Sequence, residues 1–295
     1  MIEGFTQSYV QCGDVRLSVH RAGQGVPMIL LHGYPQNHHC WASVAPAFAA
    51  HFDVIIPDLR GYGDSDAPAD MADHSTYSKR QMAADIVALM DALDIPQAHI
   101  LGHDRGGRVA YRLALDYPDR VMRLGIIEIV PTGDFWANWD ATLAMKAYHW
   151  TFLAQPAPLP ERMIGADPAA YIDWTLAAWT RDKTLDVFDR VALDSYRTQA
   201  RDPAHLTAMC ADYRAGATLD RTLDEADRAA GRKIDAPLHF LWARSGFPAQ
   251  TGDPAAIWRD WANSVTDSSC DTGHFVMEEN SAAVRTAFLT HFGVR

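Results

Sequence analysis

The sequence predicts an α/β fold: a mostly parallel, doubly wound sheet with an inserted helical cap. Two observations support this class. Apolar runs alternate with amphipathic helical segments between residues 15 and 130, and the same alternation resumes near residue 237. Between them lies a long, helix-biased region that is rich in tryptophan. Parallel strands need crossover connections, so this alternation is typical of a doubly wound sheet.

The expected elements follow in chain order. The predicted strands cover residues 15–20, 26–31, 54–58, 98–101, 124–130 and 237–242, with a further short strand before Gly273. Residues 26–31 form a continuous apolar run, which is typical of a strand buried on both faces. One helix is predicted to begin near Thr76 or Ser78. Three further helices are predicted to cover residues 109–115, 254–262 and 282–292.

The strand–helix alternation stops at Pro131-Thr132-Gly133. We therefore expect a core made of residues 1–132 and 223–295, and a helical cap made of residues 133–222.

Composition excludes several classes of protein. The 295 residues include 26 Lys+Arg and 37 Asp+Glu, for a net charge of −11. An acidic chain without a basic segment repels phosphate backbones and anionic lipids, so we expect neither nucleic-acid nor membrane partners. No secretory signal pattern precedes the first strand, which predicts a cytoplasmic location. The four cysteines are far apart, which predicts neither a disulfide framework nor a zinc site.

The most informative segment is Gly102-His103-Asp104-Arg105-Gly106-Gly107, between a predicted strand and a predicted helix. Its spacing is that of the Gly-x-Ser-x-Gly nucleophile elbow, with Asp104 in place of serine. The glycines allow a sharp turn that lifts the central residue above the sheet. Taken alone, the segment could also be a plain glycine-rich turn.

Other parts of a catalytic set follow from chain order. His32-Gly33-Tyr34-Pro35 follows a strand, where the backbone N–H of Tyr34 could form an oxyanion hole with that of Arg105. Among the histidines after Asp104, four lie in the predicted cap, a strand or the last helix. The remaining one, His274, is the candidate base. Glu128, at the end of the apolar residues Leu124-Gly125-Ile126-Ile127, is the candidate acid that orients His274, although a structural role is the alternative.

Aspartate in place of serine changes the expected reaction. A serine that attacked a saturated carbon would form an ether, which offers water no carbonyl to attack. A carboxylate such as Asp104 is ionised at pH 7 and forms an ester, which water can open. The elbow therefore predicts displacement at a saturated carbon, such as a carbon–halogen bond or an epoxide.

These motifs, together with Asp58-Leu59-Arg60-Gly61-Tyr62-Gly63-Asp64-Ser65 and Gly273-His274-Phe275, resemble the α/β-hydrolase superfamily and its fluoroacetate (haloacetate) dehalogenase branch. The similarity spans almost the whole chain. The feature specific to this branch is the pair of Arg105 and Arg108, which are one helical turn apart. Related enzymes usually carry tryptophan at the position of Arg105. Residues three apart share a helix face, so both guanidinium groups could converge beside Asp104 and hold a substrate carboxylate.

The resemblance also implies roles for cap residues and for partners. His149, Trp150 and Tyr213 match the halide pocket, and Lys146 and Trp179 match positions that line the access tunnel. The implied partner is a small halogenated carboxylate, and relatives are commonly homodimers. Glu128 departs from the family's aspartate, and the segment Gly133-Asp134-Phe135 lacks a tyrosine expected near the pocket.

Two other functions stay open. An epoxide hydrolase of the same fold would need a cap hydroxyl, which Tyr213 could supply, and a non-catalytic protein of this fold could bind small acids. We expect no cofactor and no metal. His38-His39-Cys40 contains possible metal ligands, but neighbouring residues diverge in direction, so we expect a surface cluster there.

Overall fold

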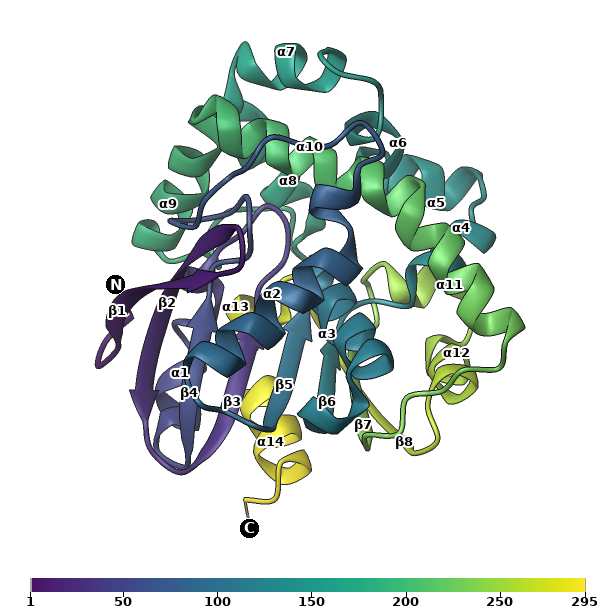
Figure 1. Cartoon of the computed structure of the whole chain (residues 1–295). Coiled ribbons are helices and arrows are strands. Elements are labelled where there is room, and N and C mark those ends of the chain that lie inside the picture. The colour runs from purple at the N-terminus through teal and green to yellow at the C-terminus, as the bar shows by residue number, and fades with distance from the viewer. Residues whose placement is uncertain (1, 295) are drawn as a thin grey trace.

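The computed structural model describes residues 2–294 and confirms the α/β class (Figure 1). Within that range, eight strands form a sheet of order β1-β2-β4-β3-β5-β6-β7-β8. The strands are β1 (Thr6–Cys12), β2 (Val15–Gly23), β3 (Val26–Leu31), β4 (Phe52–Pro57), β5 (Ala98–His103), β6 (Val121–Ile127), β7 (Leu238–Ala243) and β8 (Val265–Cys270). β2 pairs antiparallel with β1 and β4, and the pairs from β4 to β8 are parallel.

Helices cover both faces of the sheet and one of its ends. The core helices are α1 (Ala45–Ala49), α2 (Lys79–Ala92), α3 (Asp104–Asp116), α12 (Pro254–Trp261), α13 (Val276–Glu279) and α14 (Ser281–His291). Contacts join α2 to α3 on one face and α1 to α14 on the other. Short 3-10 helices are η1 (His38–Trp41), η2 (Ser75–Tyr77), η3 (Pro118–Arg120) and η4 (Pro248–Thr251).

The segment between β6 and β7 is helical. Its helices are α4 (Thr132–Ala137), α5 (Ala141–Lys146), α6 (His149–Leu153), α7 (Leu159–Gly165), α8 (Pro168–Trp179), α9 (Arg190–Arg201), α10 (Pro203–Ala217) and α11 (Leu219–Ala229). Figure 1 shows them gathered mostly above one end of the sheet, and we call them the cap. The predicted boundary at residue 222 lies inside α11, which continues to Ala229.

Two strands differ from the prediction. β1 was not predicted, because this edge strand carries mostly polar residues and offers no apolar run. β6 was expected at residues 124–130 but ends at Ile127, since Glu128 adopts a left-handed φ of 59° that strand geometry does not allow. Ile129 and Val130 are buried in the loop beyond, so their apolar character reflects burial rather than strand pairing.

The apolar core lies on both faces of the sheet, and β3, β4 and β5 contribute mainly buried residues. All four cysteines are buried and free. Within residues 2–294, none of the helices combines the length and apolar character that a membrane crossing needs.

Candidate active site

Asp104 lies at the sharp turn between β5 and α3, as the elbow motif predicts. Its φ of 48° is left-handed, and Gly33 makes room for its side chain. A Cβ on Gly33 would lie 2.4 Å from the Asp104 Cβ, and a Cβ on Gly106 would lie 2.3 Å from the Leu31 carbonyl oxygen. The Tyr34 backbone N–H donates to Asp104 Oδ1 at 2.8 Å. The candidate oxyanion donor therefore faces the candidate nucleophile.

His274 lies between the two acidic residues that the sequence singles out. Its Nε2 is 3.7 Å from Asp104 Oδ2, and its Nδ1 is 3.8 Å from Glu128 Oε1. Neither ring nitrogen has a hydrogen-bond partner among the described residues. Burial by itself lowers the pKa of His274, but the two carboxylates outweigh it and raise that pKa to about 9. With a pKa of about 9, the imidazole is protonated at neutral pH.

Glu128 is anchored by the backbone of the segment after β7. Its Oε2 accepts the Ala243 N–H at 2.7 Å, and its Oε1 accepts the Phe247 N–H at 2.9 Å. Burial raises the pKa of Glu128, although His274 and these two amides act against the rise. Gly246 leaves the room that Glu128 needs, because a Cβ there would lie 1.5 Å from Oε1.

Asp104 is held in its ionised form. Burial alone would raise the pKa of this carboxyl group, but His274 and the nearby Arg105 charge hold it well below its usual range. An ionised carboxylate at this position needs no base to become nucleophilic.

Arg105 is not free to hold a ligand with its whole guanidinium group, which differs from the expected arginine pair. Its Nε donates to Asp212 Oδ1 at 3.0 Å, and its Nη2 donates to the Asp212 backbone oxygen at 2.7 Å. The same carboxylate contacts Lys79 Nζ and accepts the Tyr62 hydroxyl at 2.8 Å. Of the Arg105 nitrogens, only Nη1 is buried with no partner in the described part of the chain. Burial opposes a charge here, yet Asp212 outweighs it and raises the pKa of Arg105.

Arg108 differs in having no carboxylate partner. Its Nη1 donates to the Val130 carbonyl and to Thr132 Oγ1, both at 3.0 Å, and its Nε meets no hydrogen-bond partner within residues 2–294. Among residues 2–294, no carboxylate oxygen lies within 4.0 Å of an Arg108 nitrogen, the distance that an ion pair requires. Burial and the neighbouring Arg105 charge lower its pKa. A buried, unpaired cation is costly, and an anionic ligand would compensate it.

The structure brings the three predicted halide-binding residues together. The ring of His149, in α6, lies 5.4 Å from that of Tyr213 in α10, and Trp150 lies 5.9 Å from Tyr213. The Tyr213 hydroxyl and His149 Nδ1 are buried, and no described residue forms a hydrogen bond with either. Burial lowers the pKa of His149 well below its usual value, so the ring is neutral and donates through one N–H.

The two predicted tunnel residues take different positions. Trp179 packs against His149 with ring centres 4.2 Å apart, and its carbonyl accepts the His274 backbone N–H at 2.8 Å. Lys146 Nζ donates to the Ser245 and Gly246 carbonyls at 2.8 and 2.9 Å. Lys146 therefore connects α5 to the segment that holds Glu128.

A small cavity joins these groups. It is lined by Asp104, Arg108, Glu128, Ile129, Val130, Phe135, His149, Trp150, Phe247, Pro248 and His274. The cavity has a volume of about 10 Å³, which is near the lower limit for one water molecule. Its charged and donor groups suit a small anion, and a larger ligand would require side chains to move outward.

Comparison with known proteins agrees with this fold. Residues 26–281 match the family model of the alpha/beta hydrolase fold. The chain is 40% identical to a fluoroacetate dehalogenase from Burkholderia sp (98% of this chain, 95% of that protein) and 31% identical to a soluble epoxide hydrolase from Corynebacterium sp. (strain C12) (99% and 95%). A solved structure from Nostoc sp PCC 7120, provisionally assigned as an alpha/beta hydrolase, superposes with a TM-score of 0.96 at 42% identity, covering 99% of both chains. The chain belongs to the alpha/beta hydrolase family.

Sequence reasoning missed the residues that hold Arg105. Asp212 stands beside Tyr213 in the chain, so the resemblance that identified Tyr213 could have drawn attention to it. Lys79 gave no signal, and Tyr62 was noted only as part of a family motif, because their contacts with Asp212 join segments more than 130 residues apart.

Replacing Gly246 with alanine should displace Glu128. We expect Gly246→Ala to reduce the free energy of unfolding by about 1–3 kcal/mol, the usual cost of overpacking. The same change should cost much less in a Glu128→Asp background, because the shorter side chain withdraws the oxygen that the added methyl group would meet. Urea denaturation of the four proteins measures this coupling. Gly165→Ala is the control, since a Cβ there meets only Leu206 at 3.9 Å. Equal losses in both backgrounds would contradict the packing argument.

The charge of Asp104 should control the titration of His274. We expect NMR to show a His274 ring that titrates near pH 9 in the unmodified protein. In Asp104→Asn the titration should move to lower pH, because a neighbouring negative charge that favours the imidazolium ion is lost. His274→Gln assigns the signal by removing it. An unchanged titration in Asp104→Asn would contradict the coupling.

Proposed function

We propose that this hydrolase removes halide from haloacetates, such as fluoroacetate or chloroacetate, to give glycolate. The observation that carries the proposal is the buried Arg108, which has no carboxylate partner and lines the same small cavity as Asp104. A substrate carboxylate would supply the missing negative charge. The similarity to a fluoroacetate dehalogenase supports the same substrate class.

In the proposed complex, the substrate carboxylate binds Arg108 and the free Nη1 of Arg105. Arg105 is fixed in advance by Asp212, so its position costs little side-chain entropy when substrate binds. The halide end lies toward His149, Trp150 and Tyr213, which donate through an imidazole N–H, an indole N–H and a phenol O–H.

The first step is displacement at the substrate's α-carbon. An Asp104 oxygen forms a bond to that carbon as the carbon–halogen bond breaks, and the halide leaves with the electron pair. Charge accumulates on the halogen only as this bond breaks, so donors directed there stabilise the transition state more than the bound substrate.

The second step needs a neutral His274. Once Asp104 is esterified, its negative charge is gone, so the pKa of His274 falls and its proton can leave to solvent. The neutral ring then takes a proton from water as the water oxygen attacks the ester carbonyl carbon. The backbone N–H groups of Tyr34 and Arg105 hold the oxyanion. Collapse returns the proton to the departing glycolate oxygen, and the Asp104 carboxyl group ionises again.

Two alternatives are weaker. An epoxide hydrolase could use the unpartnered Tyr213 hydroxyl, and one relative carries that name. A neutral epoxide, however, would leave the Arg108 charge uncompensated. A protein that only binds small acids would have no use for the carboxylate–imidazole–carboxylate arrangement around His274. The cytoplasmic location and the homodimer remain predictions.

A covalent ester should accumulate when its hydrolysis is blocked. We expect His274→Gln to gain the mass of one carboxymethyl group after treatment with bromoacetate, on a peptide containing Asp104. The unmodified protein should release halide continuously and, in heavy-oxygen water, place the label in Asp104 before glycolate. Asp104→Asn controls for alkylation elsewhere. Label found directly in the glycolate of a single turnover would contradict the ester route.

Arg108 should favour substrates that carry a carboxylate over uncharged ones. We expect Arg108→Gln to lower kcat/KM for chloroacetate by about 10- to 100-fold, the usual value of a hydrogen bond to a charged group. Chloroacetamide, which has the same leaving group and no charge, should be affected far less. Because Arg108 has no carboxylate partner, its removal leaves no acidic group unpaired. Arg80→Gln, at an exposed arginine, is the control. An unchanged ratio of the two substrates would remove Arg108 from the carboxylate site.

A further inference from the structure

A second cluster of polar groups lies apart from the cavity, beside the loop that carries Tyr34. We propose that His20, His38 and Asp58 bind one divalent transition-metal ion, such as Zn²⁺ or Co²⁺. The bound ion would stabilise the loop that carries Tyr34. The proposal does not depend on the substrate of the candidate active site, because none of the three residues lines that cavity.

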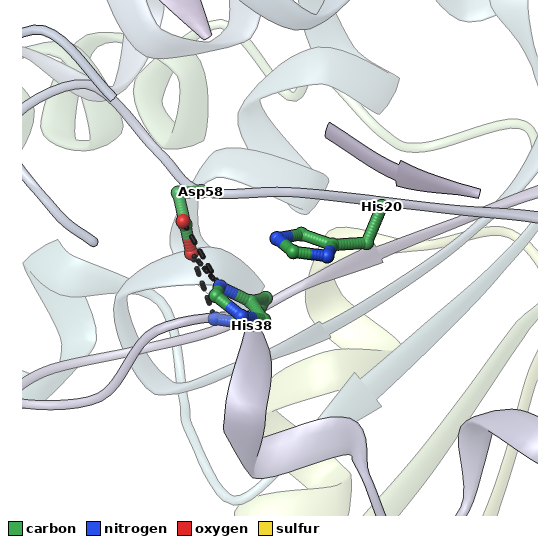
Figure 2. Close-up of side chains that lie close together, drawn as sticks. All are labelled: His20, His38 and Asp58. Atoms are coloured by element: carbon green, nitrogen blue, oxygen red, sulfur yellow. Dashed lines mark hydrogen bonds and ion pairs between the residues drawn. The ribbon is translucent and has the colours of Figure 1, made fainter. Parts of the chain in front are cut away.

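Three separate segments supply the ligands. His20 lies in β2, His38 begins η1, and Asp58 follows β4. One ligand atom from each residue lies within 4.8 Å of the others, and all three residues are buried. Figure 2 shows the His20 ring stacked on that of His38, with one edge directed toward Asp58. The two ring centres are 3.7 Å apart.

His20 is the observation that points to a ligand. It is 1% exposed, and neither of its ring nitrogens has a hydrogen-bond partner among the described residues. Buried polar atoms are normally satisfied, and each orphan is costly. Burial and the neighbouring His38 lower the pKa of His20 to about 4. The ring is therefore neutral at physiological pH, which is the form that binds a metal ion.

The other two ligands are already close together. His38 Nδ1 lies 2.9 and 3.0 Å from the two carboxylate oxygens of Asp58. Two ligands at about 2.0–2.1 Å from a tetrahedral ion lie about 3.3 Å apart. An ion between them would therefore replace this hydrogen bond after an outward shift of a few tenths of an ångström. The His20 ring, which is stacked on His38, would turn so that one of its nitrogens points at the same ion. Two imidazoles and one carboxylate suit a transition metal better than Mg²⁺ or Ca²⁺, which prefer oxygen ligands.

One of the three residues, His38, lines a surface groove. The groove has a volume of about 710 Å³ and is lined by His38, His39 and Asp64 on the core side and by Gln199 and His205 on the cap side. Water from this groove would complete the coordination.

The cluster is connected to the oxyanion loop. Asp58 accepts the His38 backbone N–H at 2.8 Å and lies 3.9 Å from His32 Nε2. His32 and His38 flank the segment that contains Tyr34. An ion held by β2, η1 and the loop after β4 would therefore fix both ends of this segment to the sheet.

The expectation from the sequence was partly wrong here. His38-His39-Cys40 was predicted to be a surface cluster, but His38 and Cys40 are buried. The argument against a site compared only neighbours in the chain. The additional ligands come from β2 and from the end of β4, which pair in the sheet.

The test is a titration of the full chain, freed of metal by a chelator, with Co²⁺ alone and then with Zn²⁺ as competitor. We expect one Co²⁺ per chain, seen in visible absorption, displacement by Zn²⁺, and a higher melting temperature with either ion. His20→Gln and His38→Gln should each weaken binding by at least about 10-fold, since even loss of an outer-shell partner costs 10- to 100-fold. Circular dichroism checks that each variant is folded.

His99→Gln is the matched control. His99 is also buried with an unpartnered Nδ1, but it stacks on Phe292 and belongs to no ligand cluster among the described residues. This variant should bind Co²⁺ as the unmodified protein does. Failure of the unmodified protein to bind one equivalent would overturn the proposal. So would undiminished binding in folded His20→Gln, which would place the ion on surface histidines.

Discussion

The buried contact between Asp212 of the cap and Arg105 of the core is the interaction on which the site depends. Each charge would be costly in this environment without the other, and Lys79 and Tyr62 complete the set around the same carboxylate. Breaking a buried ion pair by removing one partner costs about 3–5 kcal/mol. Because α10 brings Asp212 and α3 brings Arg105, the same contact that closes the cap also fixes a guanidinium group beside Asp104.

Compensation of charge explains how neighbouring arginines come to differ. Asp212 neutralises Arg105 and leaves Arg108 without an anion, so the demand for negative charge is concentrated at Arg108 in the cavity. His274 is surrounded by charge of the opposite sign, because two carboxylates raise its pKa and favour its protonated form. Esterification of one carboxylate would shift that balance. In the proposed cycle, the covalent step itself therefore prepares the imidazole to act as a base.

The parts of the site predicted from sequence are those marked by local chain geometry. Asp104 and Glu128 each follow a short apolar run, and the glycines beside Asp104 reveal its turn. Contacts between distant segments left no such mark. Asp212 with Lys79, and His20 with His38 and Asp58, meet only because helices and strands pack together. Edge strand β1 was missed for a related reason, since a polar, exposed strand lacks the apolar run that identified the others.

Sheet register explains why one histidine can approach two carboxylates. β5 and β6 are parallel neighbours, and the last residues of the two strands, His103 and Ile127, are paired. The next residues, Asp104 and Glu128, therefore leave the sheet side by side, and both have left-handed φ values of 48° and 59°. Such backbone conformations cost about 1–3 kcal/mol each and persist only where the surroundings impose them. Here the Tyr34 amide contacts the first carboxylate, while the Ala243 and Phe247 amides anchor the second. The strain thus supports an arrangement in which His274 lies between two buried acids, and a relaxed strand end would direct either side chain elsewhere.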